Sequence, residues 1–327
     1  MRIFHTDMND EFKRILLKLS FTEEKAEICA GIFTNNSLDG VYSHGINRFP
    51  VFVQYIKEGL IRVDAEPGLV EQNGLIEKWD GKSGPGMYNA TKAMDKAISL
   101  AKANGIGCVA IKNTNHWMRG GTYGWQAATA GCIGICFTNT IANMPPWGGK
   151  EPRLGNNPLV ISVPRDQGHI VLDMAMSQFS YGKLQEYELK NKKLPVPGGY
   201  DEDGNLTHDP SAVTASRRAL PIGFWKGSGL SFILDVVLTA LTGGRSTFQI
   251  TNTERETGVS QFFLCIHQQG YADNLIEEII QYTKSSSLVE NDKPVLYPGE
   301  NTLATRKRNE IDGIPVDADI WSDILKM

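Results

Sequence analysis

The chain has 327 residues, of which 41% are hydrophobic and 21% are charged, and its formal net charge is −4. These values are typical of a soluble globular protein with a large core and one to three domains. Lys and Arg form no long basic block, which argues against nucleic acid as a partner because phosphate binding needs clustered cations. The composition does not exclude an anionic small-molecule ligand held by one or two Arg or Lys side chains.

The start of the chain is polar within a few residues and lacks the apolar run of a signal peptide. No stretch approaches about 20 uninterrupted apolar residues, so we expect no membrane span. The five cysteines are an odd number, which fits buried free thiols in a reducing cytoplasm. Cys132 and Cys136 lack the second Cys or His pair that a zinc site needs. We therefore expect a cytoplasmic protein without a bound metal.

Helical patterns dominate the first third of the chain. Apolar residues recur at helical spacing over residues 10–19, and a second helix is predicted over 23–35 with Thr22 as its N-cap. Pro50 is tolerated in the first turn of a helix, so a third helix is predicted over 51–58.

The remainder of the chain alternates between strands and helices. Residues 69–79 read as a hairpin about Asn73-Gly74, and a helix over 90–104 ends at Gly105. Buried strands are predicted at 106–111, 133–137, 159–163, 170–174 and 262–266, and helices at 122–130, 178–190 (with Ser177 as its cap), 230–241, 274–283 and 317–325. This alternation indicates an α/β layer architecture.

One short segment combines three groups suited to acid–base chemistry and anion binding. Ser43, His44 and Arg48 place a hydroxyl, an imidazole and a guanidinium within a few residues of one another. An imidazole can give and take a proton near neutral pH, and the guanidinium fork fits a carboxylate. The alternative is a capping Ser with a surface His and a surface Arg, and the segment alone does not exclude it.

A second polar cluster follows the predicted strand at 106–111. The carboxyl ends of strands in open α/β sheets are common ligand sites. There His116 could orient a substrate oxygen and Arg119 could hold an anion. A structural, hydrogen-bonded His beside a packed Trp117 is equally consistent with the pattern.

Three other places suit a phosphate-bearing cofactor. Asp173 is the lone acid of an apolar strand and is either a cofactor contact, a carboxylate that tunes His44, or a buried hydrogen-bonded acid. The small residues beside Lys226 either admit a phosphate or form a plain loop. Residues 298–301 precede a helix whose N-terminus could receive an anion. The Gly-x-Gly-x-x-Gly dinucleotide fingerprint is missing, so these patterns leave the cofactor undecided.

The ordered motifs resemble those of the malate/L-lactate dehydrogenase-like (L-sulfolactate dehydrogenase-like) reductases over nearly the whole chain. The matching segments are Ser43-His44-Gly45 with Arg48, Asn115-His116, Gly155-Asn156-Asn157-Pro158, Val171-Leu172-Asp173-Met174 and Lys226-Gly227-Ser228-Gly229. These reductases use a nicotinamide cofactor without a Rossmann fold, which accounts for the missing fingerprint. The resemblance implies a three-layer α/β core with a mixed sheet over residues 69–299. It also implies a helical part over residues 1–68, packed with a C-terminal helix at 300–327, and a homodimer.

The same resemblance implies roles for individual residues. His44 is expected to donate a proton to a ketone, and the residues expected to face the substrate are Ser43, Arg48, His116 and Arg119. NAD is the expected cofactor, and NADP remains possible. The expected cofactor contacts are His169, Ile170, Val171, Leu172, Asp173, Met174, Ala175, Trp225, Lys226, Gly299, Glu300 and Asn301.

The reaction implied is the reduction of the C2 ketone of a keto sugar acid. Trp117, Met118 and Arg119 stand in place of smaller residues and favour the sugar-acid branch of the family. A malate- or lactate-type 2-keto acid is the alternative substrate. A non-catalytic protein that binds a sugar acid on the same scaffold is a second alternative, which the presence of His44 disfavours.

Overall fold

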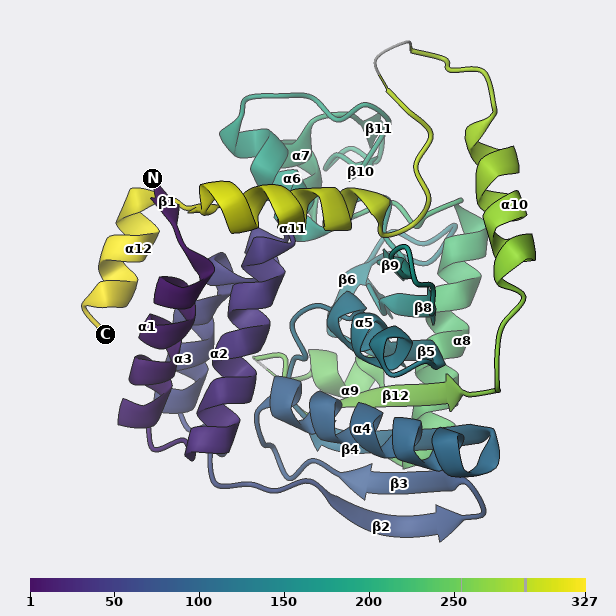
Figure 1. Ribbon diagram of the computed structural model, residues 1–327. Helices are drawn as coiled ribbons and strands as arrows, with labels where there is room; N and C mark the ends of the chain where they lie inside the picture. Colours follow the sequence, from purple (N-terminus) through teal and green to yellow (C-terminus); the bar gives the residue numbers. More distant parts are fainter. Residues whose placement is uncertain (254, 291–292) are drawn as a thin grey trace.

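The structure, a computed structural model, describes residues 1–253, 255–290 and 293–327. It consists of a helical part that contains both chain termini and an α/β part built around a seven-stranded sheet (Figure 1). Helix α11 (Glu300–Asp312) runs along both parts (Figure 1). Within the described ranges, no helix combines the length and apolar character needed to cross a membrane.

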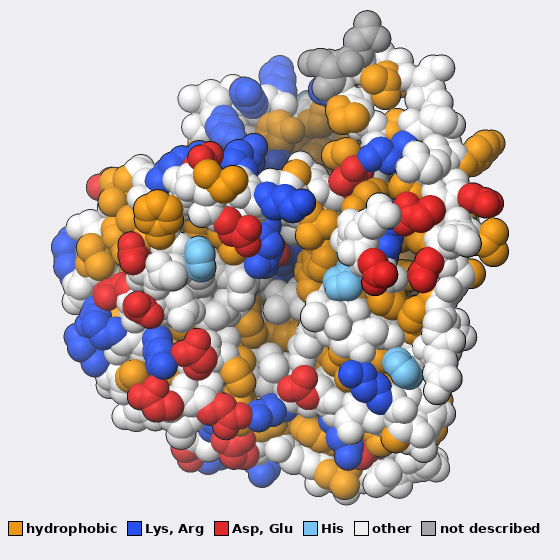
Figure 2. All heavy atoms as spheres, in the orientation of Figure 1, with side chains coloured by type: hydrophobic (Ala, Val, Ile, Leu, Met, Phe, Trp, Pro, Cys, Tyr) orange, Lys and Arg blue, Asp and Glu red, His pale blue; other side chains and the backbone are white. Residues whose placement is uncertain are grey.

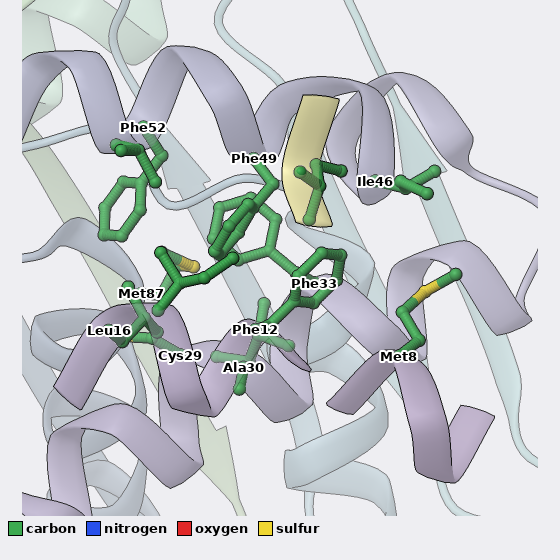
Figure 3. Close-up of a cluster of buried hydrophobic side chains, with 14 of the residues drawn as sticks. Met8, Phe12, Leu16, Cys29, Ala30, Phe33, Ile46, Phe49, Phe52 and Met87 are labelled. Carbon is green, nitrogen blue, oxygen red and sulfur yellow. The ribbon is translucent and has the colours of Figure 1, made fainter. Parts of the chain in front are cut away.

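The helical part packs around a cluster of aromatic rings (Figure 3). Its helices are α1 (His5–Lys18), α2 (Glu23–Leu38) and α3 (Phe49–Lys57). The Thr22 side chain accepts the Lys25 N–H and so forms the predicted N-cap of α2. Phe49 stacks on Phe12 with ring centroids 4.1 Å apart and meets Phe33 edge-on at 5.1 Å. These rings fix the start of α3, and therefore the end of the segment that carries His44.

The C-terminal segments complete this helical part. Strand β1 (Arg2–Ile3) pairs with β13 (Ile314–Pro315), and α12 (Ala318–Leu325) buries Trp321 in the same cluster. The Asn309 side chain of α11 donates a hydrogen bond to the Leu38 carbonyl at 2.9 Å. Residues from the two ends of the chain therefore share one core.

The central sheet is mixed, as the family resemblance implies. Its strands are, in spatial order, β2 (Gly68–Asn73), β3 (Ile76–Asp80), β4 (Ile106–Thr114), β12 (Val259–Ile266), β5 (Ile133–Thr138), β8 (Leu159–Val163) and β9 (Ile170–Met174). Only the β3–β4 pair is parallel among these neighbours. The hairpin is confirmed, but Asn73 pairs with Ile76, so Gly74 and Leu75 form its turn. Strand β9 lies at the edge of the sheet.

Helices cover both faces of the sheet. On β12, Phe263 packs with α4 (Gly86–Asn104) and α5 (Gly121–Thr129). Its neighbour Phe262 points the other way and packs with α8 (Trp225–Thr242). The three-layer α/β prediction is therefore confirmed.

The other elements are shorter or peripheral. They are β6 (Ala142–Met144), β7 (Leu154–Gly155), α6 (Tyr181–Leu189), β10 (Gly199–Tyr200), β11 (Leu206–Thr207), α7 (Pro210–Ser216), α9 (Thr247–Thr251) and α10 (Asp273–Lys284). The predicted cap at Ser177 is wrong, because Ser180 accepts the Lys183 N–H at the start of α6. Helix α8 also begins at Trp225, five residues before the predicted start at residue 230.

Candidate active site

Two side chains of helix α2 hold the His44 segment, one before Gly45 and one after it. The segment forms two 3₁₀ turns, Tyr42–His44 and Ile46–Arg48, between α2 and α3. The Asn36 side chain donates to the His44 carbonyl at 2.9 Å, and the Ser37 hydroxyl accepts the Ile46 N–H at 2.8 Å.

Gly45 permits this close approach to α2. A Cβ at position 45 would lie 2.2 Å from the Ser37 hydroxyl oxygen and 2.8 Å from the Ser37 backbone nitrogen. No real side chain tolerates such contacts, so the segment can reach this position only with glycine there. The placement of His44 thus follows from packing against α2.

Two imidazole rings lie face to face at the centre of the site. The His44 and His116 ring centroids are 5.7 Å apart, with an interplanar angle of 19°. The Ser43 hydroxyl lies 3.0 Å from His44 Nδ1, which leaves Nε2 free of a protein partner among the described residues. Ser43, which is expected to face the substrate, is placed to orient the imidazole of His44.

His116 is held as a neutral ring with a defined proton position. The Met118 N–H donates to His116 Nδ1 at 3.0 Å, so a neutral His116 carries its proton on Nε2. Burial lowers the pKa of His116 well below its ordinary value, and the charge of Arg48 acts in the same direction. His116 can therefore donate a hydrogen bond to a substrate oxygen without being charged.

Arg48 supplies a cation beside these rings. Across the described part of the chain, no acceptor forms a hydrogen bond or ion pair with its guanidinium. Its charge nevertheless acts on His44, His116 and Glu256. Burial, together with the charges of Arg48 and Arg119 and against the opposing charge of Asp173, lowers the pKa of His44 to about 4. A carboxylate ligand of Arg48 would complete this site.

Glu256 is a site residue that the sequence analysis missed. It lies between α9 and β12, and its Oε1 is 3.9 Å from His116 Nε2. Its Oε2 accepts the Ile141 N–H at 3.1 Å, and its side chain is only 14% exposed. Nothing in the polar stretch around residue 256 distinguishes this carboxylate from solvated loop residues, because its partner Ile141 lies 115 residues away.

Arg119, which is expected to face the substrate, is engaged by two carboxylates of the protein. Its side chain is 7% exposed and forms ion pairs with Asp39 and Asp173. The neighbouring residues Trp117 and Met118 are also buried, and the Trp117 ring stacks on Tyr123. These residues therefore support the site through contacts within the protein.

The predicted cofactor segments gather along strand β9. The Val171 N–H donates to the Pro298 carbonyl at 3.0 Å, which brings Gly299 beside the first half of the strand. Just past the end of β9, the Ile222 N–H donates to the Met176 carbonyl at 2.8 Å, and α8 begins with Trp225 three residues later. Asp173 connects the middle of β9 to Arg119.

The remaining cofactor candidates lie on these same elements, with their side chains in different settings. The Trp225 side chain is 64% exposed, and Lys226 is also exposed at the start of α8. Glu300 pairs with Lys284, whereas Asn301 is exposed in the first turn of α11.

This edge fits a dinucleotide. Gly299 has a φ of +96°, and a Cβ there would lie 3.2 Å from the Val171 nitrogen. The loop that carries Gly299 therefore packs closely against β9. At the start of α8, the Lys226, Gly227 and Ser228 N–H groups already donate to nearby carbonyls. In the first turn of α11, the Asn301 and Thr302 N–H groups have no partner among the described residues, and free groups of this kind at a helix N-terminus can bind a phosphate. The buried Trp125 Nε1 has no partner among the described residues, and its ring lies 5.8 Å from that of His169.

A groove opens beside α5. It has a volume of about 700 Å³, lies between α2, α4 and α5, and is lined in part by Trp125 and Gln126 (Figure 2). Over residues 1–253, 255–290 and 293–327, no cluster of three His, Cys, Asp or Glu side chains could hold a metal ion. The side chains of the site that can act on a ligand are two imidazoles, one guanidinium and one carboxylate.

The comparison with protein families agrees with this geometry. A family model described as malate/L-lactate dehydrogenase matches residues 3–325. The chain belongs to the malate/L-lactate dehydrogenase family. It is therefore an oxidoreductase of a dehydrogenase family, and the family prediction is confirmed.

Individual relatives and solved structures show which members of the family the chain resembles. The chain is 45% identical, over 330 residues and 99% of each chain, to the 2,3-diketo-L-gulonate reductase of Haemophilus influenzae. It is also 45% identical to the Pasteurella multocida protein of the same name, with the same coverage. The sulfolactate dehydrogenase structure from Methanocaldococcus jannaschii matches with a TM-score of 0.90 at 30% identity, covering 99% of this chain and 95% of that one.

The lowered pKa of His44 predicts that the folded protein loses stability as the pH falls. The unfolded chain takes up this proton near pH 6.5 and the folded chain only near pH 4, so stability falls as the pH drops through that window. His44→Asn removes this cost. Between about pH 7 and pH 4.5, the free energy of unfolding of the variant should fall by about 2 kcal/mol less than that of the parent. Urea unfolding at both pH values measures this, and parallel declines would contradict the lowered pKa.

Proposed function

We propose that this protein reduces the C2 ketone of 2,3-diketo-L-gulonate to 3-keto-L-gulonate with a reduced nicotinamide cofactor, and that His44 donates the proton. The full-length relatives named for this activity support the substrate. The observation that carries the proposal is the stacked His44–His116 pair beside an Arg48 guanidinium that the described chain leaves without a partner.

Arg48, His116 and His44 have separate roles in ketone reduction. When bound, the cofactor supplies a hydride to C2. Arg48 holds the adjacent C1 carboxylate in its fork and so fixes which face of the ketone is presented. His116 Nε2–H donates a hydrogen bond within the site, and His44 delivers a proton to the oxygen on which negative charge develops.

Substrate binding also prepares the proton donor. In the free site, Arg48 helps to lower the pKa of His44. A carboxylate bound to Arg48 offsets that positive charge, and a nearby negative charge favours the imidazolium. The proton therefore enters His44 when a substrate is in place to receive it.

Replacing the proton donor tests this mechanism directly. His44→Asn keeps a polar side chain of moderate size but cannot donate a proton from an imidazole. We expect turnover with 2,3-diketo-L-gulonate to fall about 100-fold or more while the fold is retained. NADH oxidation measures turnover, and circular dichroism checks the fold. Unchanged turnover in a folded variant would remove His44 from the mechanism.

Replacing the carboxylate anchor should have a different effect. Arg48→Lys preserves the charge but loses the planar fork that binds a carboxylate through two hydrogen bonds. We expect KM for the keto acid to rise about tenfold, with a smaller change in turnover. The same assay gives both constants, and an unchanged KM would show that Arg48 does not hold the substrate.

A smaller 2-keto acid of the malate or lactate type is the second candidate substrate. The likeness to a sulfolactate dehydrogenase structure favours it, since that relative is named for a different acid. Comparing kcat/KM for 2,3-diketo-L-gulonate, oxaloacetate and pyruvate decides between the two. Preference for oxaloacetate or pyruvate would reject the sugar acid as substrate.

For the cofactor we propose NAD, held by His169–Ala175, by Trp225 and Lys226, and by Gly299–Asn301. The segments lie together along β9, which supports a shared ligand. The Glu300 carboxylate, paired with Lys284 at the start of α11, would disfavour an added 2′-phosphate nearby. NADP remains the alternative, and a lower KM for NADPH than for NADH would select it.

We also propose that the protein is a homodimer. The outer face of α8 leaves Phe232 59% exposed, Ile233 47% exposed and Val236 43% exposed. Contiguous apolar surface of this kind marks an interaction site in soluble proteins, and two-fold dimers are the commonest assembly. Sedimentation should give a dimer for the parent protein and a monomer for Phe232→Glu. A monomeric parent at micromolar concentration would overturn this proposal.

A further inference from the structure

We propose that Glu256 selects the substrate by its charge, accepting hydrogen bonds from the hydroxyl chain of a sugar acid and repelling a second carboxylate. This inference rests on the proposed reduction of a 2-keto acid at His44 and names the class of acid that the site prefers. By this inference, the site prefers monocarboxylates that carry hydroxyl groups over dicarboxylates such as oxaloacetate.

The geometry leaves one oxygen of Glu256 available to a ligand. Oε2 is fixed by the Ile141 N–H at 3.1 Å, whereas Oε1 faces His116 Nε2 across 3.9 Å, which is longer than a hydrogen bond. His116 in turn stacks on His44 at 5.7 Å. Oε1 therefore borders the space in which a ligand of both imidazoles would sit.

The loop that carries Glu256 is fixed against the helical part. Arg255 pairs with Glu58 of α3 at 3.6 Å, and its guanidinium lies over the Tyr55 ring at 5.8 Å from the centroid. Arg255 therefore ties the loop that precedes β12 to α3 of the helical part. A substrate held between the two imidazoles would meet Oε1 with the part of the molecule that lies beside His116.

The charge of Glu256 is not cancelled by its neighbours once a substrate is bound. The Met118 N–H on Nδ1 keeps His116 neutral, so no imidazolium faces Oε1. Burial raises the pKa of Glu256, and the Ile141 N–H and the charge of Arg48 oppose that rise. The C1 carboxylate of the substrate occupies Arg48. A second carboxylate would then meet an uncompensated negative charge in a poorly solvated site, where like charges repel strongly.

Hydroxyl groups have the opposite relation to the same oxygen. An ionised carboxylate only accepts hydrogen bonds, and each hydroxyl of a sugar acid can donate one. Hydrogen bonds to a charged acceptor are among the stronger ones in proteins. Glu256 therefore favours the polyol tail of a keto sugar acid for the same reason that it disfavours a dicarboxylate.

The test compares Glu256→Gln with the parent protein on three substrates. Glutamine keeps the shape and an acceptor oxygen but removes the charge. Pyruvate is the reference because it has neither a second carboxylate nor a hydroxyl tail. We expect kcat/KM for oxaloacetate relative to pyruvate to rise at least tenfold, and that for 2,3-diketo-L-gulonate relative to pyruvate to fall. The matched control is Glu58→Gln, which removes a charge near the same loop outside the site and should change neither ratio more than about twofold.

An equilibrium measurement keeps the test independent of the proposed reaction. Calorimetry of L-malate and L-lactate binding, in the presence of NADH, reports the same discrimination without turnover, because a hydroxy acid cannot accept a hydride. We expect Glu256→Gln to raise the affinity for L-malate relative to L-lactate at least tenfold. If both the kinetic and the binding ratios stay within twofold of the parent values, Glu256 does not select by charge. If 2,3-diketo-L-gulonate is not reduced but the ratios shift as expected, the proposed substrate fails and this inference stands.

Discussion

Two ion pairs centred on Arg119 hold together the parts of the chain from which the site is built. Its guanidinium bridges Asp39, which ends α2 just before the His44 segment, and Asp173, which lies in β9. Arg306 of α11 pairs with the other oxygen of Asp39 at 2.6 Å. Loss of one partner of such a buried pair typically costs about 3–5 kcal/mol, because it leaves a desolvated charge. The distance between the proton donor and the strand at which we place the cofactor is therefore fixed by charges that cannot easily separate.

The electrostatics of the site depend on this enclosure. Burial keeps both imidazoles neutral in the free protein, and the described chain offers Arg48 no partner. The site is consequently prepared for an anion, and the anion in turn stabilises the protonated form of His44. Binding and protonation are therefore coupled, because a carboxylate on Arg48 offsets one of the charges that lower the pKa of His44. Glu256 adds a limit on how much negative charge the substrate can carry.

Local patterns predicted much of this fold from the sequence. The bounds of β8 and β9 match the predicted strands, since each is a short apolar run between turn residues. The early start of α8 was not predictable from local pattern, because Gly227 and Ser228 suggest a loop. In the structure a Cβ at Gly227 would lie 2.2 Å from the Ile222 carbonyl oxygen, so glycine serves helix packing there.

The site was predicted less completely, and the reason is again distance along the chain. His44, Arg48 and His116 carry chemistry that a sequence displays, whereas the role of Arg119 depends on Asp39 and Asp173, 80 and 54 residues away. The role of Glu256 is likewise recognised only from its contacts with Ile141 and His116. Residue type identifies the candidates, but burial and long-range partners decide which of them meet a ligand.

The central claim is that a 2-keto acid binds between His44 and strand β9 with its carboxylate on Arg48. A crystal structure of the protein with NADH and an unreactive 2-keto acid analogue tests this most directly. The account predicts the analogue carboxylate on the Arg48 fork, a His44 ring nitrogen within about 3 Å of the ketone oxygen position, and the dinucleotide along β9. A His44 ring more than about 10 Å from the bound analogue would contradict it.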